Sequence, residues 1–379
     1  MLSATLLAVL GLAAGSSAVS FLGRHFGLSE WRRLKGELEC MAGNASWVKF
    51  PSRDAVKLYD RPCAHYYNDA PFCNRTEGRA ALSYAWRTHE AAPCKSRLRR
   101  WTSADLCALV RSINLNLLLV GDSIQQEFFM TLYSALRNPG PGESCDCHGL
   151  HQDVLEICGG GHVMVGARNV HALNMGATPS DYEAAVALGK ARDYVNLTDA
   201  GGEREFRESH EPWQTLIGKH NISLLVLNRG PHWMNETVVL RDLRETLTAV
   251  FQAHGPNISV IYRTAVPGHT GCGRFFDSPP QLPRLEPEAG SDPAAAPTVQ
   301  QTPYHWQQIS EQNKAIASML ASDFPQVVLL DVHRSTVLRA DSHREPPWDC
   351  LHYCIPGPID NWVELLFSQL AVLSEYRID

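Results

Sequence analysis

The sequence has no surplus of basic residues, which separates it from proteins that bind nucleic acids through their charge. Its 379 residues include 34 lysines and arginines against 40 aspartates and glutamates, so the formal net charge at pH 7 is -6. Such a chain has no general attraction to nucleic acid, and we expect no nucleic-acid partner. It also lacks an internal repeat, and its hydrophobic share of 44% is that of a globular protein with one large domain or two smaller ones.

Charge is missing altogether between Leu2 and Gly23. Because about 20 apolar residues suffice for a helix that crosses a bilayer, segment 1–23 is predicted to be a signal-anchor that holds the protein in a membrane. A cleaved signal peptide is the alternative, since the small residues of "AAGSSAVS" are typical of a signal peptidase site. A cytosolic location for the rest of the chain would be favoured by the basic residues that follow, which are Arg24, Arg32, Arg33 and Lys35.

Sequons and cysteines oppose that cytosolic location. The eleven cysteines are more than the reducing cytosol usually tolerates. Ordinary composition gives roughly two N-x-[ST] sequons in this length, and the excess is typical of a glycosylated lumenal protein. Long domains often ignore flanking charges, so we predict a lumenal or extracellular chain. The predicted glycosylation sites are Asn44, Asn74, Asn196, Asn221, Asn235 and Asn257.

The remainder is predicted to have a juxtamembrane stem with a cysteine-rich minor lobe over 24–111 and a larger domain over 112–379. In the larger domain, unbroken apolar runs alternate with amphipathic stretches, which predicts an α/β fold with a parallel sheet covered on both faces. Two stretches interrupt the pattern as loop insertions, 138–161 and 277–302, and the second is expected to be solvated rather than a lid. The predicted strands are Leu115–Val120, Leu224–Leu227, Ser259–Arg263 and Val327–Leu330, and the predicted helices are Ile124–Leu136, Glu236–Ala253, Tyr304–Ala321 and Asp360–Leu373.

Two separated motifs predict a serine nucleophile. "LLLVGDS" ends a predicted strand with Gly121, Asp122 and Ser123, where parallel sheets place their active sites, although these are also ordinary turn and helix-capping residues. Near the C-terminus, "WDCLHYCIPGPIDNW" presents Asp349 and His352 in one short loop. A serine needs a base to take its proton and a third group to orient that base. We therefore predict that Ser123 is the nucleophile, His352 the base and Asp349 its orienter, with Gly121 and Asp122 in the oxyanion or substrate site.

Other polar residues follow strands at the same edge of the sheet. The amide of Asn228 is predicted to donate to a developing oxyanion together with the backbone N–H of Ser123, the alternative being a turn cap. Arg263 and His269 either shape the donor or acceptor pocket or have simple surface roles. Three further histidines could replace His352 as base, though none lies in so specific a motif: His232, His333 and His343.

The run "CDCHGLH" has the appearance of a zinc site, with further ligand types nearby. Its members and neighbours are Cys145, Cys147, His148, His151, Cys158 and His162. In an oxidising compartment disulfides compete for the cysteines, and serine acyl chemistry requires no metal. We therefore expect neither a bound metal nor a bound cofactor.

Taken together, these motifs resemble the trichome birefringence-like polysaccharide O-acetyltransferases, within the wider PC-esterase and GDSL/SGNH-hydrolase group. The matching stretches run nearly the whole length: C-x-x-G-x-x-x-WV, LY…PC, Y-x-W-R, LLLVGDS, LNRGPHW, RTAVPGH-x-x-C and the most specific, DCLHYCIPGPIDNW. The resemblance implies a three-layer α/β/α SGNH-hydrolase-like fold with a smaller cysteine-stapled lobe. It also implies a Golgi lumenal setting and acetyl transfer to glycan hydroxyls.

The same resemblance bears on the cysteines. Cys350 and Cys354 bracket His352, and the family pattern implies Cys272 and Cys73 as their partners, which would immobilise the loop. Further disulfide candidates are Cys40, Cys63 and Cys94, and since the count is odd at least one thiol is free or pairs intermolecularly. The chain departs from the family pattern at two places. Plant members have a polar "SRNQ"-like run where this chain has Gln125, Gln126, Glu127 and Phe128. They have a cysteine in the same helix where this chain has Ser134.

The leading hypothesis is therefore a glycan O-acetyltransferase with an acetyl-serine intermediate, anchored in the Golgi membrane or secreted after signal cleavage. Its partners are a polysaccharide acceptor and an acetyl donor as co-substrate, such as acetyl-CoA or an acetylated intermediate. The alternative is an O-acetylesterase with the same triad. A glycan-binding protein with a decayed site is a third class, but it predicts a missing triad member and none is missing. Sugar stacking is an alternative to core packing for three tryptophans, Trp233, Trp348 and Trp362.

Overall fold

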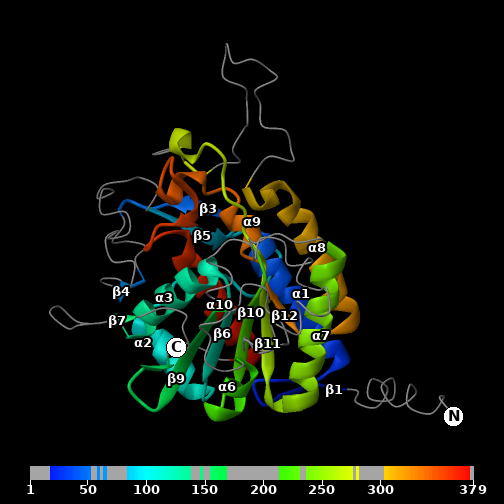
Figure 1. Cartoon of the computed structure of the whole chain (residues 1–379). Helices are drawn as coiled ribbons and strands as arrows, with labels where there is room; N and C mark the ends of the chain where they lie inside the picture. Colours follow the sequence, from blue (N-terminus) through cyan, green and yellow to red (C-terminus); the bar gives the residue numbers. More distant parts are fainter. Residues whose placement is uncertain are drawn as a thin grey trace.

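The computed structural model describes residues 18–52, 58–59, 63–65, 83–137, 146–147, 154–168, 213–230, 236–275, 279–280 and 303–375. A sheet of six strands lies at the centre, with helices on either side (Figure 1). Its strand order is β12-β11-β10-β6-β9-β8. The strands are β6 Leu117–Gly121, β8 Val154–Ile157, β9 His162–Arg168, β10 Leu224–Asn228, β11 Ser259–Arg263 and β12 Val328–Leu330. All neighbours are parallel except β8 and β9, and the four strands predicted from apolar runs are confirmed.

Alternate residues of each strand face opposite helix layers, which explains why the strands are apolar throughout. Leu117 and Leu119 belong to one hydrophobic cluster, while Leu118 and Val120 belong to another. The first layer consists of α1 Leu28–Gly43, α2 Ser103–Ser112, α3 Ser123–Arg137 and α10 Pro358–Ser374. The second consists of α6 Trp213–Lys219, α7 Glu236–His254 and α8 Ile309–Asp323. The predicted three-layer α/β/α fold is confirmed.

The predicted helices agree with α3, α7, α8 and α10, except that the one predicted from Tyr304 begins as a 3-10 helix, η8 Pro303–Gln308. Four described α-helices were not predicted from the sequence: α1, α2, α6 and the short α9 His333–Thr336. Helix α1 and helix α2 lie wholly or partly in the segment 24–111. Helix α2 begins with a capping box in which Thr102 and Asp105 bond each other's main-chain N–H groups, a signal that the sequence carried. The buried residues of both helices join the same hydrophobic cluster as the sheet.

The chain enters the fold before Gly23, the predicted end of the N-terminal segment. Strand β1 Ala18–Phe21 pairs antiparallel with β2 Arg24–Gly27, and Phe21 is buried against Trp31 of α1. The last residues of the predicted anchor are therefore part of the folded domain, because their apolar side chains cover the core. Within the described ranges no helix is long and apolar enough to cross a membrane, and residues 1–17 lie outside those ranges. The anchor stays a prediction.

The predicted insertion 138–161 contains β8, and β9 follows it directly. Strand β9 lies beside β6 near the middle of the sheet, with Leu119 opposite Gly166. The sequence signal was weak because a glycine interrupts this strand and the surrounding residues are rich in Gly and Cys. Residues 281–300 of the second predicted insertion lie outside the described residues.

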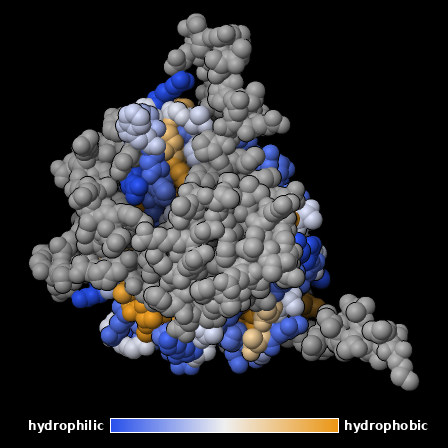
Figure 2. Space-filling model, in the orientation of Figure 1, coloured by the Kyte–Doolittle hydropathy of each residue, from blue (hydrophilic) through white to orange (hydrophobic). Residues whose placement is uncertain are grey.

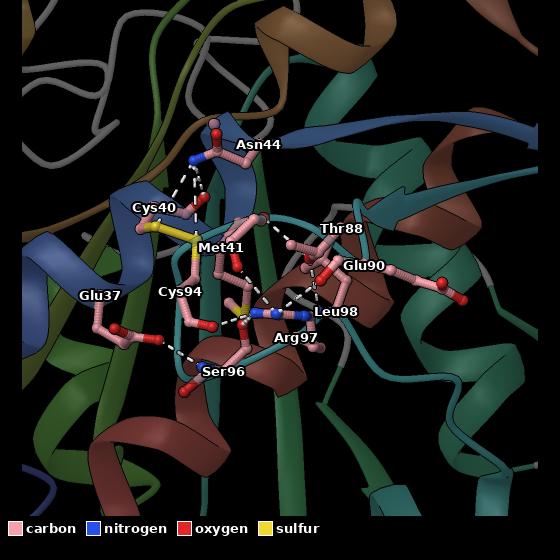
Figure 3. The surroundings of a disulfide bond; sticks show 12 residues. Glu37, Cys40, Met41, Asn44, Thr88, Glu90, Cys94, Ser96, Arg97 and Leu98 are labelled. Atoms are coloured by element: carbon pink, nitrogen blue, oxygen red, sulfur yellow. Dashed lines mark hydrogen bonds between the residues drawn. A yellow bond between two sulfur atoms is a disulfide. The ribbon is translucent and has the colours of Figure 1, made fainter.

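Among the described residues, three disulfides link segments that are distant in the sequence. Cys40–Cys94 joins the end of α1 to the loop after β5 Tyr84–Thr88, where the Asn44 amide donates to the carbonyl of Cys40 at 2.9 Å (Figure 3). The other two are Cys107–Cys158 and Cys272–Cys350. The predicted link between Cys272 and the DCLH segment is confirmed, whereas Cys107–Cys158 was not among the predicted bonds. Cys63 and Cys354 are also disulfide-bonded, and Cys73 lies outside the described residues.

On the face drawn in Figure 2, hydrophilic residues are interspersed with hydrophobic ones, and among the coloured residues the hydrophobic ones form only small separate areas.

Candidate active site

The candidate nucleophile lies at the carboxyl edge of the central sheet, directly after β6. Ser123 is the first residue of α3, and the neighbouring parallel strands β10 and β11 end at Asn228 and Arg263 on the same edge. The turn into α3 is tight at Gly121, where an added Cβ would lie 2.7 Å from Cβ of Gln125. Glycine is therefore required so that the helix can start directly above the strand.

A continuous hydrogen-bonded chain joins Ser123 to His352, which lies 229 positions further along the sequence, and through it to Asp349. Nε2 of His352 lies 2.9 Å from Oγ of Ser123, and Nδ1 of His352 lies 2.9 Å from Oδ2 of Asp349. The predicted proximity of the three residues is therefore observed. The side chain of His352 is 24% exposed, so the relay is open to molecules from solution.

The histidine lies on a hairpin rather than on the irregular loop predicted from the sequence. Strand β13 His343–Glu345 pairs antiparallel with β14 Asp349–Tyr353. The Cys272–Cys350 disulfide and a bond from the main-chain N–H of His269 to the carbonyl of Cys350 (2.8 Å) tie β14 to the segment after β11. The base is thus held on a rigid element.

Asp349 accepts four hydrogen bonds. Its Oδ1 accepts from the main-chain N–H groups of Leu351 (3.1 Å) and His352 (3.0 Å), and its Oδ2 accepts from the His352 ring and from Nη2 of Arg344 (3.1 Å). Burial opposes ionisation, but the bonds and charge of His352 outweigh it and hold the pKa of the Asp349 carboxyl well below its usual range. Burial likewise lowers the pKa of His352, yet the bond to Asp349 and the charge of Glu127 outweigh burial and raise it. The carboxylate is therefore charged at neutral pH and favours the imidazolium.

Asp122 has the capping role that the sequence left as an alternative. Its Oδ1 accepts from the main-chain N–H groups of Ile124 (2.9 Å) and Gln125 (3.0 Å), and the residue is fully buried. These bonds satisfy the donors at the start of α3, which hold Ser123 in place. The side chain of Asp122 therefore caps the helix, and the place of this residue in the oxyanion or substrate site stays a prediction.

Asn228 and Arg263 form a buried layer beneath this edge. The Asn228 amide, predicted to donate to an oxyanion, uses one N–H for the carbonyl of Arg263 at 3.0 Å, which leaves the second. Arg263 donates from Nε to Oε1 of Gln125 (2.7 Å) and from Nη1 to the carbonyl of Thr264 (3.0 Å), and its guanidinium lies 5.1 Å from the ring centroid of Trp362. Since Arg263 is fully buried, it supports the edge from below and has no surface role, and its part in shaping the donor or acceptor pocket stays a prediction.

His269 is also internal. Its Nδ1 lies 2.7 Å from Nε2 of His343, and its Nε2 lies 3.0 Å from the carbonyl of Val337. Nδ1 of His343 in turn lies 3.1 Å from the carbonyl of His352. Burial lowers the pKa of His269 to about 4 and that of His343 well below its usual value. These rings support the hairpin, so His269 does not line a pocket and His343 is not a rival base.

The structure adds one carboxyl group that the sequence did not single out. Glu127 is 5% exposed, and its Oε2 accepts from the main-chain N–H of Tyr353 at 3.1 Å. Burial raises its pKa to about 7. Its spacing of four residues from Ser123, on the same face of a helix, was the available signal.

The remaining candidates divide between exposed, buried and undescribed positions. Trp348 is 90% exposed at the tip of the β13–β14 hairpin, one residue before Asp349, whereas Trp362 is a core residue. His333 is half-buried in α9 His333–Thr336. Outside the described residues lie His232, Trp233, Cys145, His148 and His151.

Metal binding finds little support in the described part of the chain. Cys158 is bonded to Cys107 and is therefore not a free thiolate ligand. The described residues contain no group of three or more His, Cys, Asp or Glu side chains that could hold a metal ion.

A three-layer α/β/α fold with a Ser–His–Asp hydrogen-bonded chain at the carboxyl edge of its sheet is typical of one class, the SGNH-hydrolase-like proteins. Residues 234–369 match the family model described as "PC-Esterase: GDSL/SGNH-like Acyl-Esterase family found in Pmr5 and Cas1p". The chain is 23% identical to protein trichome birefringence-like 9 of Arabidopsis thaliana over 385 aligned residues, which cover 89% of this chain and 85% of the relative.

Shorter similarities point the same way. Xyloglucan O-acetyltransferase 1 of Arabidopsis thaliana is 39% identical over 57 residues, 11% of this chain and 14% of the relative. Xyloglucan O-acetyltransferase 3 of Populus trichocarpa is 37% identical over 51 residues, 11% of this chain and 13% of the relative. The C-terminal part of the chain thus matches the PC-esterase family model, and the chain is similar to the trichome birefringence-like proteins, as its motifs predict. These similarities support an enzyme of acyl-ester chemistry and, in broad terms, a link to polysaccharide O-acetylation.

Proposed function

We propose that the protein is an O-acetyltransferase that moves an acetyl group from a donor to a glycan hydroxyl through an acetyl-serine intermediate. The observation that carries the proposal is the hydrogen-bonded chain from Ser123 through His352 to Asp349. The names of the xyloglucan O-acetyltransferase relatives support a polysaccharide as acceptor.

In the first half-reaction, Nε2 of His352 takes the proton of the Ser123 hydroxyl as Oγ attacks the acetyl carbonyl carbon. The carbonyl π electrons move onto oxygen, where the backbone N–H of Ser123 and the second N–H of Asn228 stabilise the oxyanion. When the tetrahedral intermediate collapses, the bond to the donor breaks, and the leaving group takes the proton from His352. Ser123 then holds the acetyl group as an ester.

The second half-reaction repeats these steps with a sugar hydroxyl. His352 takes the proton of the hydroxyl, whose oxygen attacks the acetyl-serine carbonyl, and returns that proton to Oγ of Ser123 as the serine leaves. Both half-reactions pass through an imidazolium. The low pKa of Asp349 keeps this carboxylate charged next to Nδ1, where it stabilises the positive ring and fixes its tautomer. The acetyl donor, such as acetyl-CoA or an acetylated intermediate, enters as a co-substrate, and no step requires a bound cofactor.

Hydrolysis is the second candidate function, and the family description as acyl-esterases favours it. The same acetyl-serine would then react with water instead of a sugar. Incubation with an acetylated glycan discriminates between the two, because an esterase releases free acetate in the absence of any acceptor.

The acceptor is proposed to contact Trp348. This side chain is 90% exposed and is one residue before Asp349, so its indole gives a flat apolar surface next to the relay. Sugar rings have apolar faces that stack on such a surface. The indole is therefore proposed to orient a glycan whose hydroxyl reaches Ser123.

A lumenal location in the Golgi, with a membrane anchor or secretion after signal cleavage, is part of the proposal. Three disulfides within the described residues support an oxidising compartment. Asn221 and Asn257 are exposed and precede β10 and β11, so they lie at the edge of the sheet opposite the relay, where a glycan would leave the site open. The amide of Asn44 is bonded to Cys40, which makes this sequon a poorer acceptor (Figure 3).

The direct test is to incubate the purified chain with an isotope-labelled acetyl donor and to locate the label by peptide mass spectrometry. The expected result is an acetyl group on Ser123 that disappears when a glycan acceptor is added. Label on another residue, or transfer that persists in the Ser123→Ala variant, would overturn the proposal.

A further inference from the structure

Glu127 lies one helical turn after the candidate nucleophile. Both residues are on α3, and a separation of four places their side chains on the same face of the helix. Nothing in the relay itself requires a second carboxyl there.

One bond from Glu127 connects the nucleophile helix to the strand that carries the base. Its Oε2 accepts from the main-chain N–H of Tyr353 at 3.1 Å, and Tyr353 follows His352 directly on β14. Tyr353 is itself fixed, because its hydroxyl donates to the carbonyl of Pro267 at 2.9 Å. The bond therefore sets the distance between α3 and β14, on which the contact between Ser123 and His352 depends.

The other carboxyl oxygen of Glu127 forms no comparable bond within the described part of the chain. Oε1 of Glu127 is buried and has no hydrogen-bond partner among the described residues. Burial of a charged oxygen without a partner is costly, and a glutamine would accept the Tyr353 bond at a lower cost. The bond alone therefore does not explain a carboxyl group at this position, so its charge needs a separate explanation.

The charge acts mainly on the base. The groups that interact with Glu127 through space are His352, Asp349 and Tyr353 on β14, Arg344 on β13 and Arg263 on β11. His352 comes first among the charged groups that oppose the effect of burial on Glu127. Conversely, the charge of Glu127 favours the protonated form of the His352 ring.

We propose that Glu127 is a positioning residue that fixes the base-bearing strand against the nucleophile helix and stabilises the positive charge that His352 gains during acetyl transfer. The inference rests on the proposed function, in which His352 is protonated in both half-reactions. Two carboxylates then act on one imidazole: Asp349 through a direct bond to Nδ1, and Glu127 through space from the opposite element. Their environments differ, because Asp349 accepts four hydrogen bonds whereas Glu127 accepts one.

Glu127 and His352 titrate as a coupled pair, because each favours the charged form of the other. Burial raises the pKa of Glu127 to about 7, so it gains its charge near neutral pH, and the pKa of His352 is raised above its usual value. The charge that favours the imidazolium is therefore more complete above pH 7 than below it. We therefore expect the charge of Glu127 to affect the acid limb of the pH profile of acetyl transfer.

Two variants separate the bond from the charge. Glu127→Gln keeps an oxygen for the N–H of Tyr353 and removes the charge, whereas Glu127→Asp keeps the charge and is too short for the same bond. The readout is the titration of the His352 ring, followed by NMR in full-length protein with labelled histidine and assigned with the His352→Gln variant. This measurement requires no turnover, so its outcome is independent of whether the chain transfers acetyl groups.

The matched control is Glu364→Gln. Glu364 is also a buried glutamate, but it is bonded to Arg87 at 2.7 Å and is not among the groups whose charge acts on His352. Its substitution is expected to leave the His352 titration unchanged. Any general effect of neutralising a buried glutamate would appear in both variants.

The expected result is that His352 in Glu127→Gln loses its proton at a lower pH and in a single step, while Glu127→Asp retains most of the wild-type titration. For acetyl transfer, the acid limb of the pH profile of kcat should move in the same direction, and the maximal rate should fall several-fold. A His352 titration that is identical in wild type and Glu127→Gln overturns the inference. A shifted titration without any acetyl transfer in the wild type would instead refute the proposed function and leave the electrostatic coupling intact.

Discussion

At the amino-terminal edge of the central sheet, Asn116 joins β6 to the turn before β10 through neutral hydrogen bonds to the carbonyls of His220 (3.3 Å) and Asn221 (3.2 Å). At the carboxyl-terminal edge of the same strands, several of the buried polar groups are ionisable, namely Asp122, Arg263 and Glu127. Both edges connect strands to helices, and neutral groups suffice for that purpose at the first. Buried ionisable groups cost free energy unless they are well bonded, so their concentration at one edge indicates that this edge is built for chemistry.

The largest expected effect concerns Ser123 at the carboxyl edge. Ser123→Ala should reduce acetyl transfer by at least about 10³-fold, because no other described hydroxyl is bonded to His352. The free energy of unfolding should change by less than about 1 kcal/mol, since the residue is only half-buried. Steady-state kinetics and thermal denaturation measure the two quantities. An inactive variant that is also unfolded would not separate catalysis from stability, and Asn116→Asp at the other edge is the matched control for activity.

Two disulfides close loops of similar length, so removing each of them in turn tests whether the carboxyl edge has a special role. In the chain-entropy model, loops of 54 and 78 residues each stabilise the protein by about 4 kcal/mol, so removal of Cys40–Cys94 or of Cys272–Cys350 should lower the unfolding free energy by similar amounts. Only the second bond holds the strand of His352. Its paired Cys→Ser variant should therefore lose about 10- to 100-fold in kcat, whereas the Cys40–Cys94 variant should keep kcat in its folded fraction. Equal losses of kcat in both would contradict a specific role in positioning the base.

Glu127 also gives a prediction for stability. Its pKa is raised from 4.5 to about 7 in the folded protein, so its contribution to stability is complete below about pH 4.5 and is lost as the pH rises through 7. Above pH 7 the charged group costs roughly 3 kcal/mol relative to the protonated one. Glu127→Gln should therefore gain stability over the wild type between pH 5 and pH 8. Denaturant unfolding at several pH values measures this difference, and a difference between variant and wild type that is the same at pH 5 and pH 8 would argue against a buried, neutral carboxyl.

Trp348→Ala should have a smaller effect that is confined to the acceptor. Stacking on one aromatic ring is worth about 1 kcal/mol, so KM for the glycan should rise roughly five-fold. Acetylation of Ser123 by the donor should not change, because the indole is 90% exposed. Single-turnover labelling and acceptor kinetics separate the two steps. If only the labelling step changed, Trp348 would be assigned to donor binding and not to acceptor binding.

The smallest effect is expected at the amino-terminal edge. Asn221→Gln and Asn257→Gln should each remove a glycan from protein that is secreted by a eukaryotic host, visible as a shift in electrophoretic mobility. Acetyl transfer should stay within about twofold of the wild type, since both residues lie at the opposite edge from the relay. A large loss of activity in folded protein would show that the two edges are coupled.

The sequence by itself determined the elements whose signals are local. Four apolar runs gave β6, β10, β11 and β12, because strands buried on both faces have no polar positions. The sequence also paired Ser123 with the Asp349–His352 motif, because a serine nucleophile needs a base and a group that orients the base. It did not give β9, whose glycine and neighbouring cysteines obscure the pattern.

Only the tertiary structure decided what each polar residue at that edge does. Asp122 and Glu127 are both acidic residues beside the same serine, yet one caps a helix and the other lies buried under the base. Arg263 and His269 have motif positions that suggest a pocket, but packing turns both inward. The physical reason is that burial and hydrogen-bond partners set the role and the pKa of an ionisable group, and both come from residues far away in the chain.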